Sequence, residues 1–291
     1  MRQIIKLAFI SIISNFAISA IAMDSTTKNN PVGRQTIKIA MAQIICIDGD
    51  LSGNLVRITN ALEEAAQKQA DIIVFPESSL LGWINPEAFQ RATPIPGRES
   101  EIICELARKY KIHICIGLDE KDGDKLYDSA ILVNDNGKIL IKHRKINVLP
   151  DLMTPPYSVG EGVQTVQTRF GTIGVMICAD SFSDNLLENM KEKKPDLLLI
   201  PYGWAAPENE WPDHGKELLK VVMKAAAKVN CPVIGTNLIG QVSHGPWTGQ
   251  IYGGQSVAFD PGKDILMVGK DRDSVPICDS TRPPGWLMKK Q

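Results

Sequence analysis

The stretch Asp71-Ile-Ile-Val-Phe-Pro-Glu77 (DIIVFPE) places four consecutive apolar residues between two carboxylates. A short, uninterrupted apolar run of this kind is typical of a strand buried on both faces of a sheet. Residues 53–69 before it and 99–110 after it carry apolar side chains at helical spacing. With apolar runs at 37–46 and 112–117, the order becomes strand, helix, strand, helix, strand, which predicts parallel pairing.

The remainder of the chain adds hairpins to these parallel units. Asn134-Asp135-Asn136-Gly137 separates two apolar runs, and Asn-Gly favours a tight turn because both residues tolerate positive φ. Hairpins are also expected around Arg169-Phe170-Gly171 and around Asp260-Pro261-Gly262-Lys263. Further helices are predicted at 184–193 and 214–229, and further strands at 172–178, 197–201 and 233–237. This pattern predicts an α/β fold with mixed sheets, packed as a single domain over residues 36–270, followed by a C-terminal tail at 271–291.

The bulk composition excludes several classes of protein. The 32 basic and 33 acidic residues give a net charge of −1, so we expect no nucleic-acid partner and no attraction to an anionic membrane. The six cysteines are scattered, and no pair has the C-x-x-C spacing of a zinc site, so no metal is expected. Most of these cysteines should be small buried residues.

The first 22 residues have the form of a secretory signal peptide. Arg2 and Lys6 precede an uncharged, mostly apolar run, and Ala20 and Ala22 are spaced as at a cleavage site. The alternative, an uncleaved anchor, is less favoured because the run is about 16 residues against the roughly 20 that a membrane span needs. We therefore expect cleavage after Ala22, a polar linker at 23–35, and a periplasmic or secreted protein that is free of the membrane once the signal is removed.

Three polar residues stand where apolar runs end. Glu77 follows residues 71–76, Lys145 follows 139–144, and Cys178 follows 174–177. In sheets with parallel strands, reactive groups gather beyond the carboxyl ends of the strands, where the loops leave a crevice. Taken singly, each residue is more often structural, so the hypothesis of one catalytic site depends on the set and its flanking sequence.

These flanking sequences resemble the nitrilase superfamily of carbon–nitrogen hydrolases, in its amidase-like branch. Residues 71–77 look like the strand with the general-base glutamate, His143-Arg144-Lys145 like the arginine–lysine motif, and residues 171–180 (GTIGVMICAD) like the nucleophile strand and turn. Their order and separations also fit, and the resemblance covers roughly residues 36–270. It implies a four-layer α-β-β-α sandwich, in agreement with the mixed pattern of strands and helices.

The chemistry explains why these three residue types belong together. A thiolate is a strong nucleophile, but a free thiol is mostly protonated at neutral pH. Glu77 can accept that proton and pass it to the departing amine, while Lys145 stabilises the thiolate and the oxyanion. The backbone N–H of Ala179 is the expected second oxyanion donor. Water would then hydrolyse a thioester at Cys178, and no metal or organic cofactor is required.

The sequence departs from the family pattern at one position and suggests the substrate at others. A second glutamate that many members carry about eight residues after the lysine is replaced by Met153, and Asp151 is the nearby candidate for its role. The resemblance associates Asp180, two residues after the nucleophile, with amides or carbamoyl compounds rather than nitriles. Tyr202 and Trp204 are expected to line the substrate pocket.

Other functions stay open at this level. The same triad could hydrolyse nitriles or transfer an acyl group, and an inactive exported small-molecule-binding protein is the non-enzyme alternative. A Cys–His hydrolase is less favoured, because the side chain of His143 should alternate away from Lys145 along its strand. We expect a small-molecule amide as the ligand and a homo-oligomer, a homodimer by default.

Overall fold

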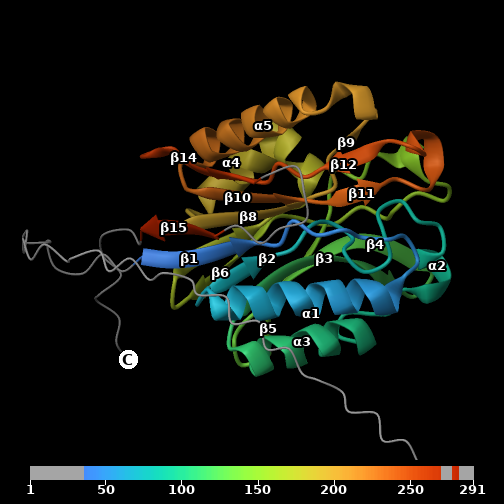
Figure 1. Ribbon diagram of the computed structural model, residues 1–291, viewed down its shortest axis with the longest axis horizontal. Helices are drawn as coiled ribbons and strands as arrows, with labels where there is room; N and C mark the ends of the chain where they lie inside the picture. The colour runs from blue at the N-terminus through green and yellow to red at the C-terminus, as the bar shows by residue number, and fades with distance from the viewer. Residues whose placement is uncertain (1–35, 270–276, 282–291) are drawn as a thin grey trace, which may run out of the picture. The chain divides into compact units, whose positions relative to one another are not determined.

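A computed structural model describes residues 36–269 and 277–281 (Figure 1). The expected signal peptide, the linker and much of the expected C-terminal tail lie outside the described residues. The first sheet contains six strands, of which β1, β2 and β3 run parallel while each outer strand is antiparallel to its neighbour. In spatial order the strands are β15 (Ile277–Thr281), β1 (Thr36–Met41), β2 (Ile72–Val74), β3 (His113–Asp122), β4 (Lys125–Val133) and β5 (Ile139–Arg144).

The second sheet repeats this plan. Its three inner strands β10, β8 and β7 run parallel, and antiparallel strands flank them on both sides. Each parallel pair is joined through a helix, as the strand–helix–strand reading predicted. In spatial order the strands are β14 (Asp264–Val268), β13 (Val257–Asp260), β10 (Val233–Asn237), β8 (Leu197–Tyr202), β7 (Gly171–Val175) and β6 (Gln164–Thr168).

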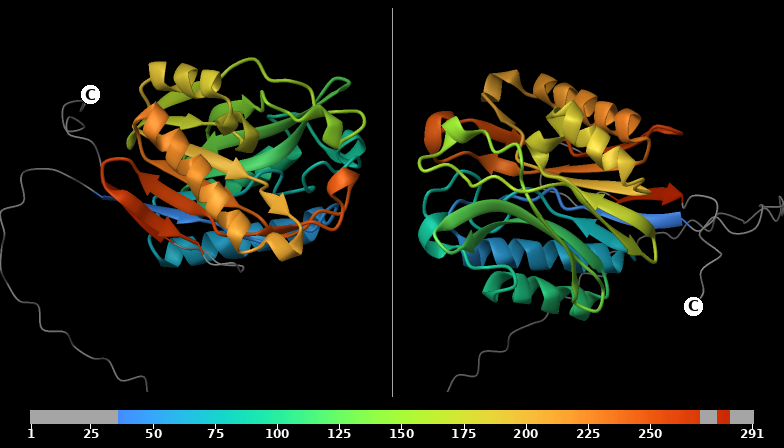
Figure 2. Two further views of the ribbon diagram at one scale, coloured as in Figure 1. Left: turned by 90° about the horizontal axis from the view of Figure 1, so that it is seen from above. Right: turned by 180° about the vertical axis from the view of Figure 1, so that it is seen from behind.

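Four layers result from packing the two sheets face to face. One core cluster joins the inner faces, for example Ile39 and Leu132 of the first sheet with Val175 and Leu199 of the second. Helices α1 (Leu51–Gln67) and α3 (Arg98–Tyr110) cover the outer face of the first sheet, and α4 (Asp184–Glu192) and α5 (Asp213–Val229) cover that of the second (Figures 1 and 2). The predicted α-β-β-α sandwich and the single domain are confirmed.

Local sequence signals explain where two of the helices begin. The side chain of Asp50 accepts a hydrogen bond of 3.0 Å from the backbone N–H of Gly53 and so caps α1. Ser183 caps α4 in the same way through the N–H of Leu186. Because a cap satisfies a backbone donor that the first helical turn leaves free, these residues fix the start of each helix.

Three details differ from the sequence expectation. The strand expected to reach Cys178 ends at Val175, and a short 3-10 helix begins at Cys178 itself. Part of the expected tail, Ile277–Thr281, is the edge strand β15 and pairs with β1. A third, small sheet of β9 (Ala205–Ala206), β12 (Ile251–Gly253) and β11 (Ile239–Gln241) was not expected, since its strands are too short to give a periodic signal.

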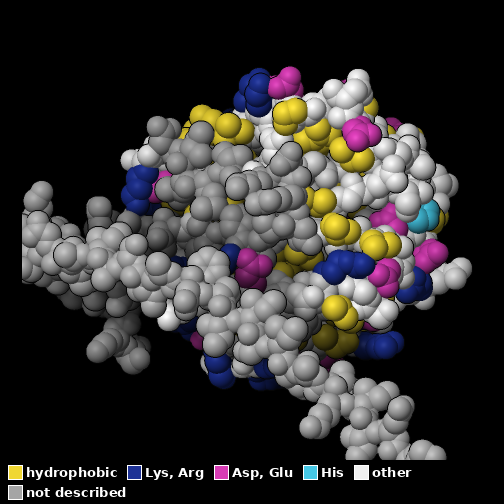
Figure 3. All heavy atoms as spheres, viewed as in Figure 1, with side chains coloured by type: hydrophobic (Ala, Val, Ile, Leu, Met, Phe, Trp, Pro, Cys, Tyr) yellow, Lys and Arg dark blue, Asp and Glu magenta, His cyan; other side chains and the backbone are white. Residues whose placement is uncertain are grey.

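The described surface matches the balanced composition. Basic and acidic side chains are interspersed on the face seen in Figure 3. Within residues 36–269 and 277–281, no helix is both long enough and apolar enough to cross a membrane.

The turn after β2 is held against both sheets. Backbone bonds join it to Gly117 of β3, from the Gly117 N–H to the Pro76 oxygen (3.1 Å) and from the Ser79 N–H to the Gly117 oxygen (2.9 Å). The Glu77 N–H donates to the Tyr202 oxygen of the second sheet at 3.4 Å. A Cβ at Gly117 would lie 2.6 Å from Glu77 Cα, so only glycine allows this close approach of two backbones.

We therefore predict that Gly117→Ala lowers the free energy of unfolding by about 1–3 kcal/mol, because an extra methyl group in a packed site forces the backbone to shift. Gly162→Ala is the control, since a Cβ there meets nothing within 4 Å. It should change stability by no more than about 0.5 kcal/mol. Urea unfolding of both variants measures the difference, and equal midpoints would contradict the proposed role of Gly117.

Candidate active site

Three segments end at the same edge of the sandwich, where the inner faces of the two sheets meet. Glu77 follows β2, Lys145 follows β5, and Cys178 follows β7. Lys145 Nζ donates a hydrogen bond to Glu77 Oε1, and the thiol of Cys178 interacts with the carboxylate of Glu77. All three residues are at most 4% exposed. The structure thus brings together the three residues that the strand-end pattern selected.

A second carboxyl group completes the surroundings of the ammonium. Asp128 of β4 lies with its Oδ2 atom 3.2 Å from Lys145 Nζ, and its backbone oxygen accepts from the Lys145 N–H at 2.8 Å. Asp119, the cross-strand partner of Asp128 on β3, accepts a 2.8 Å bond from the hydroxyl of Tyr157. Asp128 therefore holds the ammonium that Glu77 also binds.

The cysteine stands on a sharp turn. Ile177 is extended, whereas Cys178 has φ = 38°, a region that residues with a side chain seldom adopt and that costs roughly 1–3 kcal/mol. Ser181 stabilises the turn, because its hydroxyl donates to the Cys178 oxygen at 2.7 Å and bonds the hydroxyl of Tyr202 at 2.8 Å. The turn directs the thiol into the space beyond the strand ends.

Asp180 joins this turn to the segment that follows Lys145. Its Oδ1 atom accepts from the backbone N–H groups of Ile146 (2.9 Å) and Asn147 (2.8 Å), and its Oδ2 atom accepts from that of Ile177 (3.1 Å). His143 Nε2 lies 2.8 Å from Oδ2 as well. The expectation that His143 points away from Lys145 was wrong, since side chains two residues apart on a strand share a face.

The charges of the cluster shift the titration of its members. Burial raises the pKa of Cys178 well above its usual value, and the charge of Glu77 adds to this while Lys145 opposes it. Burial lowers the pKa of Lys145, but the charge of Glu77, together with the contact to Asp128, outweighs it and raises that pKa well above the usual range. Burial and then Glu77 raise the pKa of Asp128, and burial raises the pKa of Asp119 to about 7. Lys145 is therefore a cation at neutral pH.

Two backbone N–H groups lie at the sulfur. That of Gly203 donates to the thiol, and a Cβ at this glycine would lie 2.8 Å from Glu77 Oε2. That of Ala179 belongs to the first turn of the short helix Cys178–Phe182 and so has no acceptor within that helix. The Gly203 group already points at the sulfur and the Ala179 group has no acceptor within its helix, so both can donate to an oxyanion formed next to the sulfur.

A cavity of about 160 Å³ opens onto Cys178. Trp204 stands in its wall between two other rings, with centroids 5.6 Å from Phe182 and 5.1 Å from His214. Trp83 and Trp247 form another part of the wall, 5.6 Å apart in an edge-to-face contact. The cavity is thus bounded mainly by aromatic rings.

The expected pocket residues fall in different places. Trp204 lines the cavity, as predicted, and its loop is fixed by Asn237, whose Oδ1 atom accepts from the Trp204 N–H at 2.7 Å. The expectation for Tyr202 was wrong, because this residue is fully buried and supports the cysteine turn through Ser181. The expectation for Asp151 was also wrong: it is exposed in a surface turn, and Asp128 occupies the place beside Lys145.

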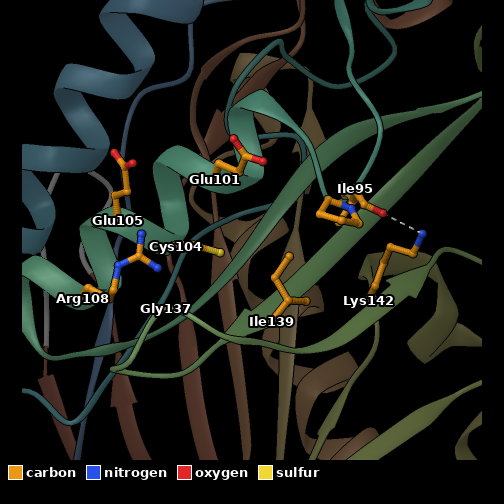
Figure 4. A pocket seen from close by; sticks show the side chains of 9 residues that line it. Ile95, Glu101, Cys104, Glu105, Arg108, Gly137, Ile139 and Lys142 are labelled. Carbon is orange, nitrogen blue, oxygen red and sulfur yellow. Dashed lines mark hydrogen bonds between the residues drawn. The ribbon is translucent and has the colours of Figure 1, made fainter.

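A larger hollow of about 630 Å³ lies on the outer side of the first sheet, between α3 and β5 (Figure 4). It is open to solvent, and Lys142 at its edge is bonded to the Ile95 oxygen at 3.1 Å. None of Glu77, Lys145 and Cys178 lines it. We therefore assign the candidate site to the smaller cavity, where a thiol, a carboxylate and an ammonium meet. No group of three or more potential metal ligands occurs among the described residues.

Comparison with known proteins agrees with this geometry. The family model described as carbon-nitrogen hydrolase matches residues 38–277. The chain belongs to the carbon–nitrogen hydrolase family. This confirms the nitrilase-superfamily resemblance and shows an enzyme that acts on C–N bonds.

Individual relatives of this hydrolase include both nitrilases and amidases. A probable nitrilase of Schizosaccharomyces pombe is 26% identical over 69% of this chain and 73% of its own length. An omega-amidase of Saccharomyces cerevisiae is 31% identical over 50% of this chain and 56% of its own length. Among solved structures, a mutant amidase of a Nesterenkonia species in complex with acrylamide has a TM-score of 0.74 at 17% identity, covering 91% of this chain and 97% of its own.

Several site residues of the hydrolase were missed by sequence reasoning. Asp128 could have been found, because it is a lone acid in the apolar run LYDSAILV at a position that faces inward with Leu126 and Ala130. Trp83, His214 and Trp247 could not, since they come from loops and a helix start whose approach to Cys178 is a tertiary property.

Asp128 should act in its protonated form. Its carboxyl also interacts with that of Glu77, and a neutral acid between the carboxylate and the ammonium leaves one buried charge of each sign. We predict that Asp128→Asn keeps kcat/KM within about tenfold of the wild type, whereas Asp128→Ala, which removes the contact to Lys145, loses at least about 100-fold.

The pH dependence of stability gives an independent readout. Because burial raises the folded-state pKa of Asp128, its protonated form contributes stability that is complete below about pH 4 and declines as the pH rises toward the folded pKa. The Asn variant lacks this titration, so the wild type should lose stability relative to Asp128→Asn from pH 4 to pH 8. In the activity assay, a loss in Asp128→Asn as large as that in Asp128→Ala would contradict the neutral form of Asp128.

Proposed function

We propose that this protein hydrolyses the C–N bond of a small amide or carbamoyl compound through a thioester at Cys178. The observation that carries the proposal is the contact of one thiol, one carboxylate and one ammonium at the end of a cavity large enough for a small molecule. The positive φ of Cys178 supports it as well, because such strain is typical of functional turns.

In the first step Glu77 accepts the thiol proton and the sulfur attacks the carbonyl carbon. The C=O π pair moves to oxygen, and Lys145 with the Ala179 N–H stabilises the negative charge. Collapse of this intermediate breaks the C–N bond, and Glu77 passes its proton to the leaving nitrogen. The products are ammonia or an amine and a thioester at Cys178.

In the second step water completes the cycle. Glu77 takes a proton from a water molecule, which adds to the thioester carbon, and the same oxyanion donors serve again. The C–S bond then breaks, the acid product forms, and the proton returns to the sulfur. The same residue acts as acid and as base, as the sequence of proton transfers requires.

The preference for amides over nitriles is supported by the relatives named omega-amidase and amidase, while nitrilases among the relatives keep nitriles as the second candidate. Asp180, which the family resemblance associated with amides, binds backbone N–H groups and His143 and does not line the cavity. Its part in any such preference is to position the cysteine turn.

We predict that Cys178→Ala abolishes ammonia release from amides, with a loss of at least about 10³-fold, because no other group can form the thioester. Cys104→Ala is the matched control, since Cys104 is also buried but lines the larger hollow on the outer side of the first sheet (Figure 4). It should retain activity. Ammonia assays on both variants, with mass spectrometry of the trapped acyl-enzyme, test the assignment, and the reverse result would move the site to that hollow.

We also propose that this chemistry takes place outside the cytoplasm, which the composition of residues 1–22 supports. The N-terminus of the protein recovered from the cells that produce it should then be Met23. Intact-mass analysis of that material is the measurement, and retention of residues 1–22 would contradict the proposal.

An oligomer, by default a dimer, remains our expectation for the assembled enzyme.

A further inference from the structure

The cavity at Cys178 has a mainly apolar lining. Most of its described wall is formed by the rings of Trp83, Phe182, Trp204 and Trp247 and the side chain of Leu149. Besides Cys178, the titratable residue in its described lining is His214. Because an apolar wall offers a charged group neither solvation nor a partner, a ligand with a charged tail is disfavoured there.

No side chain near the cavity offers a free positive charge to a ligand in its described part. The ammonium of Lys145 is bonded to Glu77 and Asp128, which face it from β2 and β4. His214 stacks on Trp204 at an angle of 25°, and burial lowers its pKa, so its ring is neutral at pH 7. A substrate carboxylate in this cavity would therefore meet no free positive charge in the described lining.

The volume gives the size of the group that the cavity can enclose. The cavity measures about 160 Å³. An apolar protein cavity of about 150 Å³ holds one benzene molecule, so this cavity accommodates one six-membered ring or a branched chain of about six carbon atoms. Aromatic walls favour a flat ring through offset or edge-to-face contacts.

We infer that the substrate of this hydrolase is an amide with an uncharged, apolar acyl group of about the size of a phenyl ring, held against Trp204 and Trp247. This inference rests on the proposed function, because the group in the cavity is the one that becomes attached to Cys178. This substrate class differs from that of enzymes whose amide substrates carry a carboxylate on the acyl group.

The test compares two amides of matched shape. 4-Methylpentanamide and succinamate share the same two-carbon spacer and differ in an isopropyl group against a carboxylate. We expect kcat/KM for ammonia release to be at least about 100-fold higher for 4-methylpentanamide, because the carboxylate loses its hydration without gaining a partner. Equal or faster hydrolysis of succinamate would overturn the inference and leave the proposed function standing.

The size preference is tested with benzamide and 2-naphthamide. Wild-type enzyme should prefer benzamide by at least about tenfold, and Trp204→Ala should reduce that preference by enlarging the cavity. Phe89→Ala, which removes an aromatic side chain outside the cavity lining, is the control and should keep the wild-type ratio. An unchanged ratio in Trp204→Ala would overturn the placement of the acyl group.

A binding measurement distinguishes an error in the inferred acyl group from an error in the proposed reaction. Three tryptophans line the cavity, so quenching of their fluorescence in the Cys178→Ala variant reports occupancy without turnover. This variant should bind 4-methylpentanamide in preference to succinamate. If it does so while the wild type releases ammonia from none of the four amides, the proposed hydrolysis of amides is overturned, and the inference about the acyl group, which rests on it, falls with it. A preference for succinamate in this binding experiment would overturn the inference directly.

Discussion

The buried ammonium of Lys145 is the interaction on which the site depends. Removing a cation from water costs several kcal/mol, and this cost is offset only where carboxyl groups with good geometry surround the ion. Glu77 supplies one such group from the turn after β2, and Asp128 supplies the other from β4. Because the two acids and the lysine come from three different strands, the cluster requires the first sheet to be correctly paired. The site therefore requires β2, β3, β4 and β5 to pair in the correct register.

The second sheet contributes the thiol that we propose as the nucleophile and fixes it to the first sheet. Asp180 accepts backbone hydrogen bonds from the turn at Cys178 and from the segment after Lys145, and it binds His143 of β5. A single buried carboxylate thus sets the position of the thiol relative to the ammonium. The hydrogen bond from the Glu77 N–H to Tyr202 forms a second link between the sheets. Catalytic geometry in this fold is a property of the interface between sheets rather than of either sheet alone.

Two kinds of surroundings meet at Cys178, one polar and one aromatic, and we assign them different roles. Polar groups contact the thiol and the ammonium, whereas aromatic rings line the cavity where the acyl group would be held. Apolar walls strengthen the electrostatic interactions of Lys145 and disfavour charged ligands by the same physical effect. The chemistry and the selectivity that we propose therefore have a common origin in the low polarity of the cavity.

The sequence by itself determined the layers and the reacting groups. The apolar runs around residues 71–76 and 197–201, the helical spacing between them and the Asn-Gly turn predict mixed sheets, because strand and helix periods are local properties. The sequence identified Glu77, Lys145 and Cys178 because each follows an apolar run. Asp128 was detectable because it is an acid at a strand position whose side chain faces inward. The supporting roles of Tyr202 and Asp180, the exposure of Asp151 and the aromatic wall were decided by the tertiary structure alone. The reason is physical: side chains on loops and at the ends of strands are placed by packing between distant segments, and a periodic pattern carries no information about that packing.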